Sequence, residues 1–192
     1  QKETIPSEPI IFTKAMTSLI GPNDAIDASI DPTDSVDYEG ELGVIISKTA
    51  RRVAKADWQD YVFGYVIIND VTSRELQKKH NQWTIGKGLD TFGPMGPYIV
   101  TKDEIDDLPS MQIQTLVNDE VRQQAEIRDL IFDIPTLIET LTLTGTLLAG
   151  DVIATGTPVG VGIGFTPPKF LKSGDVVTIN VTGLGSLTNP VI

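Results

Sequence analysis

The chain has 192 residues and a net charge of −11, and 40% of its residues are hydrophobic. These values are typical of one soluble globular domain, and no apolar run approaches the roughly 20 residues that a membrane span needs. Phosphate binding requires clustered Lys and Arg, so the acidic balance argues against nucleic acid as a partner. The lack of cysteine excludes disulfides, thiolate metal sites and a cysteine nucleophile.

The first part of the chain predicts short strands separated by turns. Residues 1–37 are rich in Pro, Asp, Ser and Thr, and the apolar piece at 9–13 is expected to be a strand. Residues 38–47 predict a strand in which positions 39, 41, 43 and 45 share one face. The β-branched and aromatic run at 61–68 predicts a second, buried strand.

The middle of the chain predicts a helix and a hairpin. The segment Thr72-Ser-Arg-Glu75 has the form of a capping box, so we expect a helix from Thr72, its N-cap, to about Lys79. Two apolar segments, 111–117 and 121–124, flank Asn118-Asp119-Glu120, a pattern typical of a hairpin.

The last third of the chain predicts one more helix followed by strands. Asp133 is a candidate N-cap, and Pro135 suits the first turn of a helix over 134–142. Turns at 150–151 and 174–175 each precede a β-branched run. The whole pattern predicts an α+β, mostly β chain with a few short helices, folded as a single domain over residues 1–192.

Three carboxylates are candidate metal ligands. Glu39 and Glu41 stand two apart on a predicted strand, so their side chains point the same way. Asp70 ends an apolar strand, a common place for a site residue. An exposed strand face for the glutamates and a turn or cap for Asp70 are the structural alternatives. Without Cys or clustered His, three carboxylates suit a hard cation such as Mg²⁺, Mn²⁺ or Ca²⁺.

Basic and polar side chains follow Asp70. Arg74 and Gln77 share a face of the predicted helix, where Arg74 could bind a substrate carboxylate and Gln77 a carbonyl or hydroxyl group. Lys87 stands between two glycines and could neutralise a developing enolate. The alternatives are a solvated helix face for the first two residues and a turn for Lys87.

The remaining motifs are less specific. The glycine-rich stretch 156–168 could present the Thr157 hydroxyl and backbone N–H groups to an anion, but its spacing differs from the dinucleotide-binding fingerprint. His80 is the only histidine and falls among lysines at a predicted helix end, which favours a surface role. A serine triad within the chain is therefore not expected.

The order and spacing of four segments are more specific than any single residue. The segments are Tyr38-Glu-Gly-Glu-Leu-Gly-Val, Gly64-Tyr-Val-Ile-Ile-Asn-Asp-Val-Thr-Ser-Arg-Glu-Leu-Gln77, Trp83-Thr-Ile-Gly-Lys-Gly-Leu-Asp-Thr-Phe-Gly-Pro-Met-Gly-Pro97 and Gly150-Asp-Val-Ile-Ala-Thr-Gly-Thr-Pro158. Together they resemble the fumarylacetoacetate hydrolase family, from Pro9 to the C-terminus. The resemblance implies a mixed, mostly β fold of layered sheets that form a roll, and a homodimer or an assembly of dimers.

The resemblance also implies roles for eight residues. Glu39, Glu41 and Asp70 match the metal carboxylates of the family, and Lys87 matches a lysine near metal and substrate. The positions that match substrate-contacting residues, or fall in the same loop as one, are Arg74, Gln77, Thr91 and Thr157. Gly86 stands where alanine is common in the family.

One family motif has no counterpart in the chain. Members usually carry Asn-Tyr-x-x-His, with a Glu shortly after the His, just before the segment that corresponds to residues 6–14. Those residues form a catalytic dyad on a mobile lid. Glu3 is a poor candidate for the lid role, because it lacks the accompanying His. Either the lid segment lies upstream of residue 1, which we expect because Gln1 is not a natural start, or the protein has no lid base.

The implied activity is a Mg²⁺- or Mn²⁺-dependent hydrolase that cleaves a C–C bond in a small 2-oxo acid or acylpyruvate through a metal-bound enolate. Alternatives within the family are an oxaloacetate decarboxylase and a keto–enol tautomerase or isomerase. A non-catalytic scaffold that binds a metal or an oxo acid is an alternative of another class. A cytoplasmic location is expected, or a mitochondrial one if a targeting segment has been removed.

Overall fold

The computed structural model of the chain describes residues 6–79 and 81–192. The predictions for Glu3 and His80 lie outside the described residues. None of the helices within the described ranges has the length and apolar character needed to cross a membrane.

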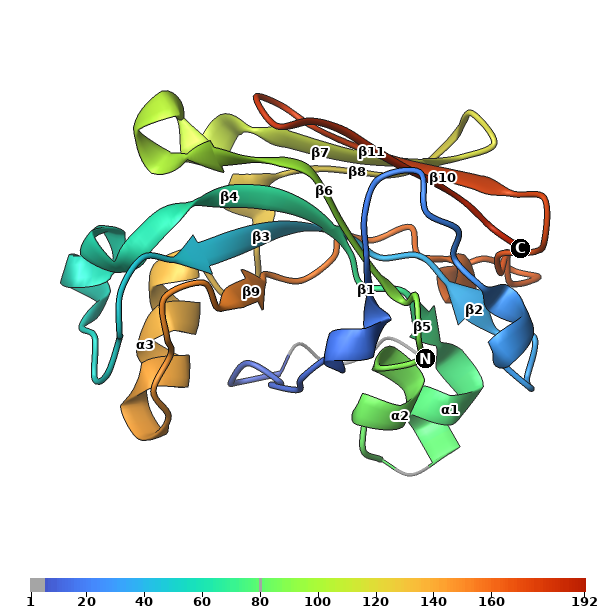
Figure 1. Cartoon of the computed structure of the whole chain (residues 1–192), viewed down its shortest axis with the longest axis horizontal. Helices are drawn as coiled ribbons and strands as arrows, with labels where there is room; N and C mark the ends of the chain where they lie inside the picture. Colours follow the sequence, from blue (N-terminus) through green and yellow to red (C-terminus); the bar gives the residue numbers. More distant parts are fainter. Residues whose placement is uncertain (1–5, 80) are drawn as a thin grey trace.

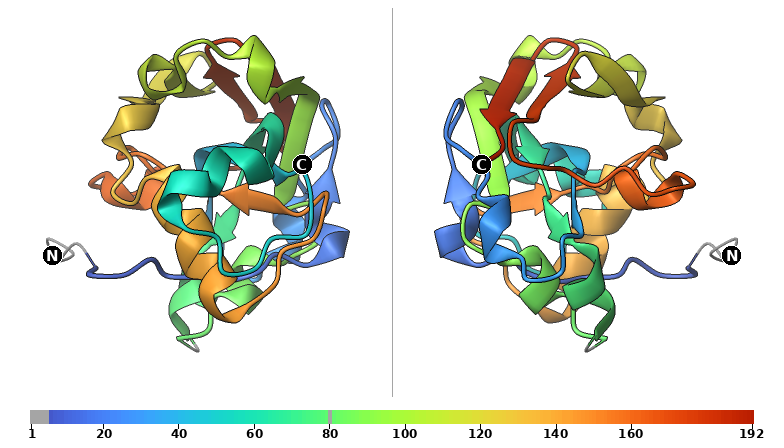
Figure 2. Two further views of the ribbon diagram at one scale, coloured as in Figure 1. Left: turned by 90° about the vertical axis from the view of Figure 1, so that its left-hand side faces the viewer. Right: turned by 90° about the vertical axis from the view of Figure 1, so that its right-hand side faces the viewer.

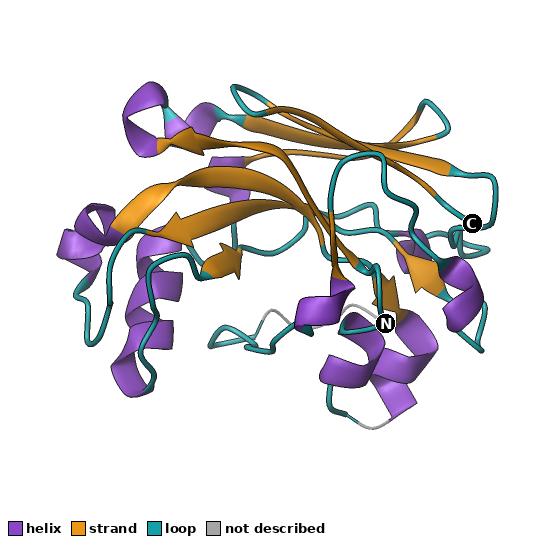
Figure 3. Cartoon of the chain, viewed as in Figure 1, coloured by secondary structure: helices purple, strands orange, loops and turns teal. Residues whose placement is uncertain are grey.

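Strands and short helices make up the described chain, with strands predominant (Figure 3). The strands are β1 (Leu19–Ile20), β2 (Val36–Asp37), β3 (Gly40–Ile46), β4 (Val62–Asn69), β5 (Thr72–Ser73), β6 (Gly93–Thr101), β7 (Gln112–Val117), β8 (Glu120–Glu126), β9 (Val152–Ala154), β10 (Val176–Val181) and β11 (Gly185–Pro190). The α-helices are α1 (Arg74–Lys79), α2 (Thr84–Lys87) and α3 (Ile134–Thr144). The 3-10 turns are η1 (Met16–Ser18), η2 (Ala28–Ile30), η3 (Lys55–Tyr61), η4 (Lys102–Glu104), η5 (Leu108–Ser110), η6 (Ile127–Asp129) and η7 (Gly162–Gly164).

Two curved sheets form the body of the molecule. One sheet has the order β1-β6-β4-β3-β9, the other has the order β11-β10-β7-β8, and β2 and β5 form a separate pair. Figure 1 shows the four-stranded sheet stacked on the five-stranded sheet, with α1, α2 and α3 on the far side of the latter. The end-on views of Figure 2 show how the layers curl around one another. The expected mostly β roll with a few short helices is confirmed.

Strand β3 divides its side chains between two environments. Leu42, Val44 and Ile46 belong to the main hydrophobic core, which also contains Ile113 and Ile179 of the four-stranded sheet. These even-numbered residues therefore face the space between the two sheets, and side chains alternate along a strand. The odd-numbered residues, among them Glu41 in β3 and Glu39 just before it, must face the opposite side.

The opposite face of β3 carries a second, smaller apolar cluster. Ile45 packs with Val66, Ile68 and Met95, separately from the main core. Glu41 pairs directly with Ile68 across β3 and β4. The buried carboxylate of Glu41 thus lies beside an apolar patch, which offers it no hydrogen-bond donors.

Local predictions fail at one strand and at one helix start. The strand expected at 9–13 does not form, because these residues pair with no strand of the described chain. The hairpin predicted from 111–117 and 121–124 is confirmed as β7 and β8, with Glu120 in the strand rather than the turn, and Asp133 caps α3 by accepting a hydrogen bond from the Thr136 N–H. Thr72 is not an N-cap, so the capping-box prediction is wrong: Thr72 lies in β5, pairs with Asp37 of β2 and donates its hydroxyl to the Asp70 carbonyl. The pairing of two strands distant in sequence overrides the local capping signal.

Candidate active site

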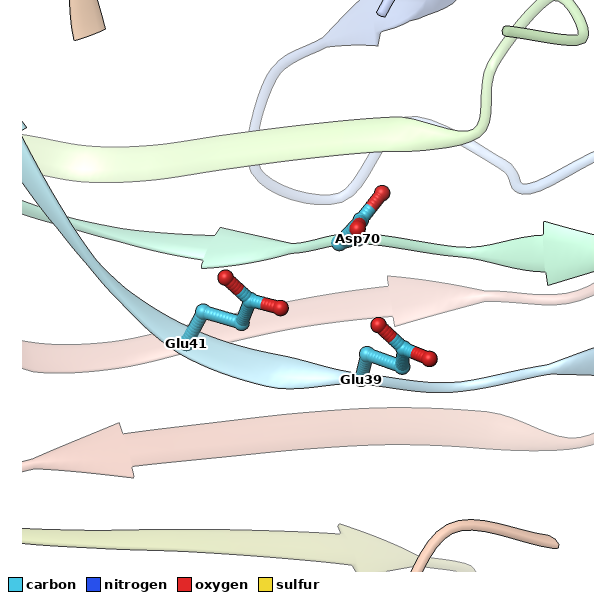
Figure 4. A group of neighbouring side chains, drawn as sticks. All are labelled: Glu39, Glu41 and Asp70. Atoms are coloured by element: carbon cyan, nitrogen blue, oxygen red, sulfur yellow. The ribbon is translucent and has the colours of Figure 1, made fainter. Parts of the chain in front are cut away.

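The register of β3 and β4 brings the three predicted carboxylates together. Gly40 pairs with Asn69, and the Asp70 N–H donates to the Glu39 carbonyl at 2.9 Å, which places Asp70 beside the glutamates. Glu39, Glu41 and Asp70 are 7%, 3% and 1% exposed. One oxygen of each carboxylate lies within 4.8 Å of the others. Figure 4 shows the three side chains on one side of the two strands.

Two of the predicted cations lie against these carboxylates. The Lys87 ammonium, at the end of α2, donates to Glu39 Oε2 at 2.6 Å and to Asp70 Oδ2 at 2.7 Å. Arg74, the first residue of α1, donates from Nη1 to Glu39 Oε1 at 2.5 Å. Lys87 is 2% exposed and Arg74 is 6% exposed, so both cations are buried with the carboxylates.

The charges of the buried partners keep Lys87 protonated. Burial lowers the pKa of Lys87, but the carboxylates of Glu39, Asp70 and Glu41 outweigh burial and raise the pKa above its ordinary value. The same balance of burial against Glu39 and Asp37 raises the pKa of Arg74. The site therefore contains two fixed positive charges.

Lys14 is the third cation of the site, and the sequence analysis missed it. Its ammonium donates to Asp70 Oδ1 at 2.7 Å and also to the carbonyls of Val71 and Lys87. Burial lowers the pKa of Lys14, and the neighbouring Asp70 offsets only part of this effect. Lys14 stands in a stretch rich in turn-forming residues, and only its contact with a residue 56 positions away reveals its place in the site.

Glu41 is the carboxylate that the chain leaves least satisfied. Its Oε2 accepts one hydrogen bond, from the Gly156 N–H at 2.7 Å, and no Lys or Arg in the described part of the chain forms an ion pair with it. Burial, and then the charges of Asp70 and Glu39, raise the pKa of Glu41 to about 8. An added cation would stabilise its ionised form.

The donor set fits a hard divalent cation. The cluster consists of four carboxylates and three cations, namely Asp37, Glu39, Glu41 and Asp70 with Lys14, Arg74 and Lys87. It has an excess of one negative charge when all these groups are ionised. Carboxylate oxygens are the ligands that Mg²⁺, Mn²⁺ and Ca²⁺ prefer. The residues that could hold the ion are Glu39, Glu41 and Asp70.

Asp37 is a second residue that the sequence analysis missed. It is completely buried and accepts from Arg74 Nε at 2.8 Å, Gly162 N at 2.6 Å and Ile163 N at 3.0 Å. Asp37 therefore binds both the arginine of the site and the middle of the glycine-rich loop. Its position two residues before Glu39, with the same strand alternation, is the signal that could have revealed it.

Thr157 lies in the glycine-rich loop beside β3. Its hydroxyl donates to the Gly40 carbonyl at 3.0 Å and accepts from Gln123 Nε2 at 2.7 Å. The single hydroxyl proton is thus committed to the backbone between the two glutamates. Gln123, from β8, is a third residue that the sequence analysis missed.

Gln77 and Thr91 lie farther from the carboxylates. Gln77 Oε1 accepts from Arg74 Nη1 at 3.3 Å, so Gln77 adjoins the site through the arginine. Thr91 Oγ1 accepts from the Asp27 N–H at 2.9 Å, and Thr91 has a φ of 67°, a strained value for a β-branched residue. The substrate-contacting roles of both residues stay predictions.

Similarity to known proteins identifies the family to which the chain belongs. The family model described as fumarylacetoacetate (FAA) hydrolase, C-terminal, matches residues 1–192. YisK, an oxaloacetate tautomerase of Bacillus subtilis, is 50% identical over 187 residues, which are 97% of this chain and 62% of that protein. The chain belongs to the fumarylacetoacetate hydrolase family, whose members are enzymes and typically depend on a divalent metal.

Solved structures agree with this membership. A fumarylacetoacetate hydrolase from Exiguobacterium antarcticum has a TM-score of 0.92 and 47% identity, over 95% of this chain and 65% of that chain. A 5-carboxymethyl-2-hydroxymuconate delta-isomerase from Mycobacterium smegmatis has a TM-score of 0.88 and 43% identity, over 97% of this chain and 70% of that chain. The chain spans about three fifths of the length of the first curated relatives it matches.

Proposed function

We propose that this chain is the metal-binding core of an enzyme that interconverts keto and enol forms of a small 2-oxo acid, with oxaloacetate as the first candidate. The observation that carries the proposal is the buried cluster in which charged Lys87 bridges Glu39 and Asp70, while Glu41 forms no ion pair with a Lys or Arg of the described residues. The 50% identity with a protein named oxaloacetate tautomerase supports the choice of reaction.

In this proposal Glu39, Glu41 and Asp70 hold the divalent ion. Bound there, the ion supplies a Lewis acid that favours the enolate form of a 2-oxo acid. Lys87 is already charged and buried beside these ligands, so it stabilises negative charge on a substrate oxygen without reorganisation. The stabilisation by Lys87 comes from the protein and adds to that of the metal ion.

Arg74 and the glycine-rich loop orient the acid in the same proposal. Arg74 Nη2 is buried and has no hydrogen-bond partner among the described residues. It is therefore a free donor for a substrate carboxylate, and Gln77 next to it offers an amide. Because the hydroxyl proton of Thr157 is committed to Gly40, the donors that we assign to the substrate are those backbone N–H groups of the loop that do not already bind Glu41, Asp37 or another backbone carbonyl.

A C–C bond hydrolase acting on an acylpyruvate is the second candidate. The 47% identity with a solved fumarylacetoacetate hydrolase favours it. Hydrolysis would use the same stabilised enolate as its leaving group, with a base that activates water. A small 2-oxo acid substrate, a homodimer and a cytoplasmic location belong to both candidates and stay predictions.

The test is to follow decay of enol-oxaloacetate by its ultraviolet absorbance, and acylpyruvate cleavage in parallel, with Mg²⁺ or Mn²⁺ and after chelation. We expect metal-dependent tautomerisation that falls at least 100-fold in Glu39→Gln and Asp70→Asn. Glu75→Gln is the matched control, because Glu75 is an exposed carboxylate next to Arg74 whose ion pair in the described chain is with Lys78, outside the metal site. Cleavage without tautomerisation would favour the hydrolase, and unchanged rates and metal affinity in both site variants would refute the metal-site assignment.

A further inference from the structure

Gln123 connects the second sheet to the metal-site strand. It lies on β8 of the four-stranded sheet, opposite Thr115 of β7, and is 1% exposed. Its side chain reaches β3 and the glycine-rich loop, which belong to the other layer of the molecule. A buried amide that links separate layers has few alternative positions.

Each polar atom of the Gln123 side chain has a partner. Oε1 accepts from the Gly40 N–H at 3.0 Å, and Nε2 donates to Thr157 Oγ1 at 2.7 Å and to the Pro158 carbonyl at 2.8 Å. This set fixes the orientation of the amide, because a flipped amide would face an N–H with its own NH₂ and two acceptors with its own oxygen.

The backbone group that Gln123 holds stands between the two metal-site glutamates. On this edge of β3, pairing with β9 covers residues 43–45, and the Thr155 N–H bonds the Leu42 carbonyl. At Gly40 the partners are side chains: Gln123 takes the N–H and Thr157 takes the C=O. A shift of this peptide would move the glutamates on both sides of it.

Gly40 has no side chain that could hold its peptide in place. A Cβ at Gly40 would lie 2.2 Å from Thr115 Oγ1 and 3.3 Å from Ile179 Cγ2, so the second sheet leaves no room for a side chain. A glycine without a packed side chain is the most freely moving residue of a strand. Its placement depends on the hydrogen bonds that it receives.

We propose that Gln123 is a positioning residue of the metal site, which acts by fixing the Gly40 peptide between Glu39 and Glu41 and the hydroxyl of Thr157. The inference rests on the proposed function, because it takes these glutamates as metal ligands. Partners behind the direct ligands typically change metal affinity by about 10- to 100-fold when lost.

A purely structural role would give a different result from a positioning role. Loss of a packing residue lowers the melting temperature with and without metal by the same amount and leaves metal affinity unchanged. Loss of a positioning residue weakens metal binding and reduces the increase in melting temperature that the metal produces. The two readouts separate the roles.

The experiment measures Mn²⁺ binding by isothermal titration calorimetry, and melting temperature with and without Mn²⁺. We expect Gln123→Met, which keeps the length and loses the hydrogen bonds, to weaken Mn²⁺ binding about 10-fold or more. Gln124→Met is the matched control on the exposed neighbour and should bind like the wild type. Thr157→Val removes the hydroxyl that bonds the Gly40 carbonyl. The two side chains hold the same peptide, so the Gln123→Met/Thr157→Val double variant should lose less Mn²⁺ affinity than the product of the two single fold-losses.

A measurement on the wild type keeps the inference testable if Gln123→Met does not fold. In nuclear magnetic resonance spectra, Mg²⁺ should shift the side-chain NH₂ signals of Gln123 and the Gly40 amide, and leave the side-chain signals of Gln124 in place. If the wild type binds Mn²⁺ and Gln123→Met binds it with the same affinity, the inference is overturned while the proposed function stands. The same holds if Mg²⁺ binds the wild type without shifting the Gln123 signals. Absence of Mn²⁺ binding by the wild type would overturn the proposed function, and the inference with it.

Discussion

Two buried carboxylates at neighbouring places in the fold have opposite surroundings. Asp31 is 3% exposed and accepts hydrogen bonds from the backbone and hydroxyl groups of Thr33 and Ser35 and from the hydroxyl of Ser73. Burial raises the pKa of Asp31, but these hydrogen bonds outweigh burial and lower it. Glu41 accepts one hydrogen bond, and its pKa rises to about 8.

Adjacent residues serve the two groups. Ser73 bonds Asp31, while Arg74, the next residue, bonds Asp37 and Glu39. The chain completes the hydrogen bonding of Asp31 with its own neutral donors, which makes Asp31 part of the framework. Among the described residues it gives Glu41 one hydrogen bond and no ion pair, which leaves this carboxylate able to accept an added cation. Completeness of hydrogen bonding, rather than burial, distinguishes Glu41 from Asp31.

The strongest way to break this comparison is to neutralise Glu41. In Glu41→Gln we expect Mn²⁺ affinity to fall by at least about 100-fold, beyond the usual effect of an outer partner. The metal-free protein should not lose stability, because a neutral amide removes the cost of a buried, incompletely bonded carboxylate. Titration calorimetry and metal-free thermal unfolding measure the two effects. A stable variant with wild-type affinity would show that Glu41 is not a ligand.

The reciprocal change at Asp31 should have the opposite profile. We expect Asp31→Asn to lower the free energy of unfolding by about 1–2 kcal/mol at pH 7, because buried donors lose a charged acceptor. Mn²⁺ affinity should stay within about twofold of the wild-type value. Urea unfolding and titration calorimetry test this pair of expectations, and a large loss of affinity would contradict the separation of the two clusters.

The same variant has a defined pH dependence. Because folding lowers the pKa of Asp31, its ionised form stabilises the protein above the unfolded pKa of about 3.9, and this stabilisation is lost as the pH falls through the lower folded value. The difference in stability between wild type and Asp31→Asn should therefore shrink at about pH 3. A difference that grows in acid would reverse the sign and refute the assignment.

The smallest expected effect concerns an exposed carboxylate with one structural task. Asp133 caps α3, and its hydrogen bonds with Thr136 lower its pKa. Asp133→Ala should lower the free energy of unfolding by about 1 kcal/mol and leave Mn²⁺ affinity unchanged. Urea unfolding and titration of the same sample provide the check. An effect on affinity would mean that stability and metal binding are not independent in this fold.

Local patterns were enough to predict much of this molecule. Alternation along β3 placed Glu39 and Glu41 on one face, and Asp133 marked the start of α3. Thr72 was misassigned because β5 forms by pairing with β2, a contact between residues about 35 positions apart. Local helix or strand propensity does not indicate which distant segment a strand will pair with.

The residues of the site also fall into those that the sequence predicted and those that only the fold reveals. Glu39, Glu41 and Asp70 stand in motifs whose spacing identifies them, and resemblance to a family supplied the roles. Lys14 and Gln123 stand in no such motif and reach the carboxylates or their backbone across 56 and 83 positions of sequence. Only the folded chain shows that they belong with the site.

The edge of β3 has one more consequence. The pairing with β9 covers residues 43–45 and does not reach Gly40, which is buried. A buried N–H or C=O group without a partner would cost free energy there. At Gly40 the side chains of Gln123 and Thr157 occupy both of these groups. The residues that we place around the metal site thus also satisfy a buried peptide that has no strand partner on this side, so the solvation balance of the backbone and the placement of the glutamates depend on the same few hydrogen bonds.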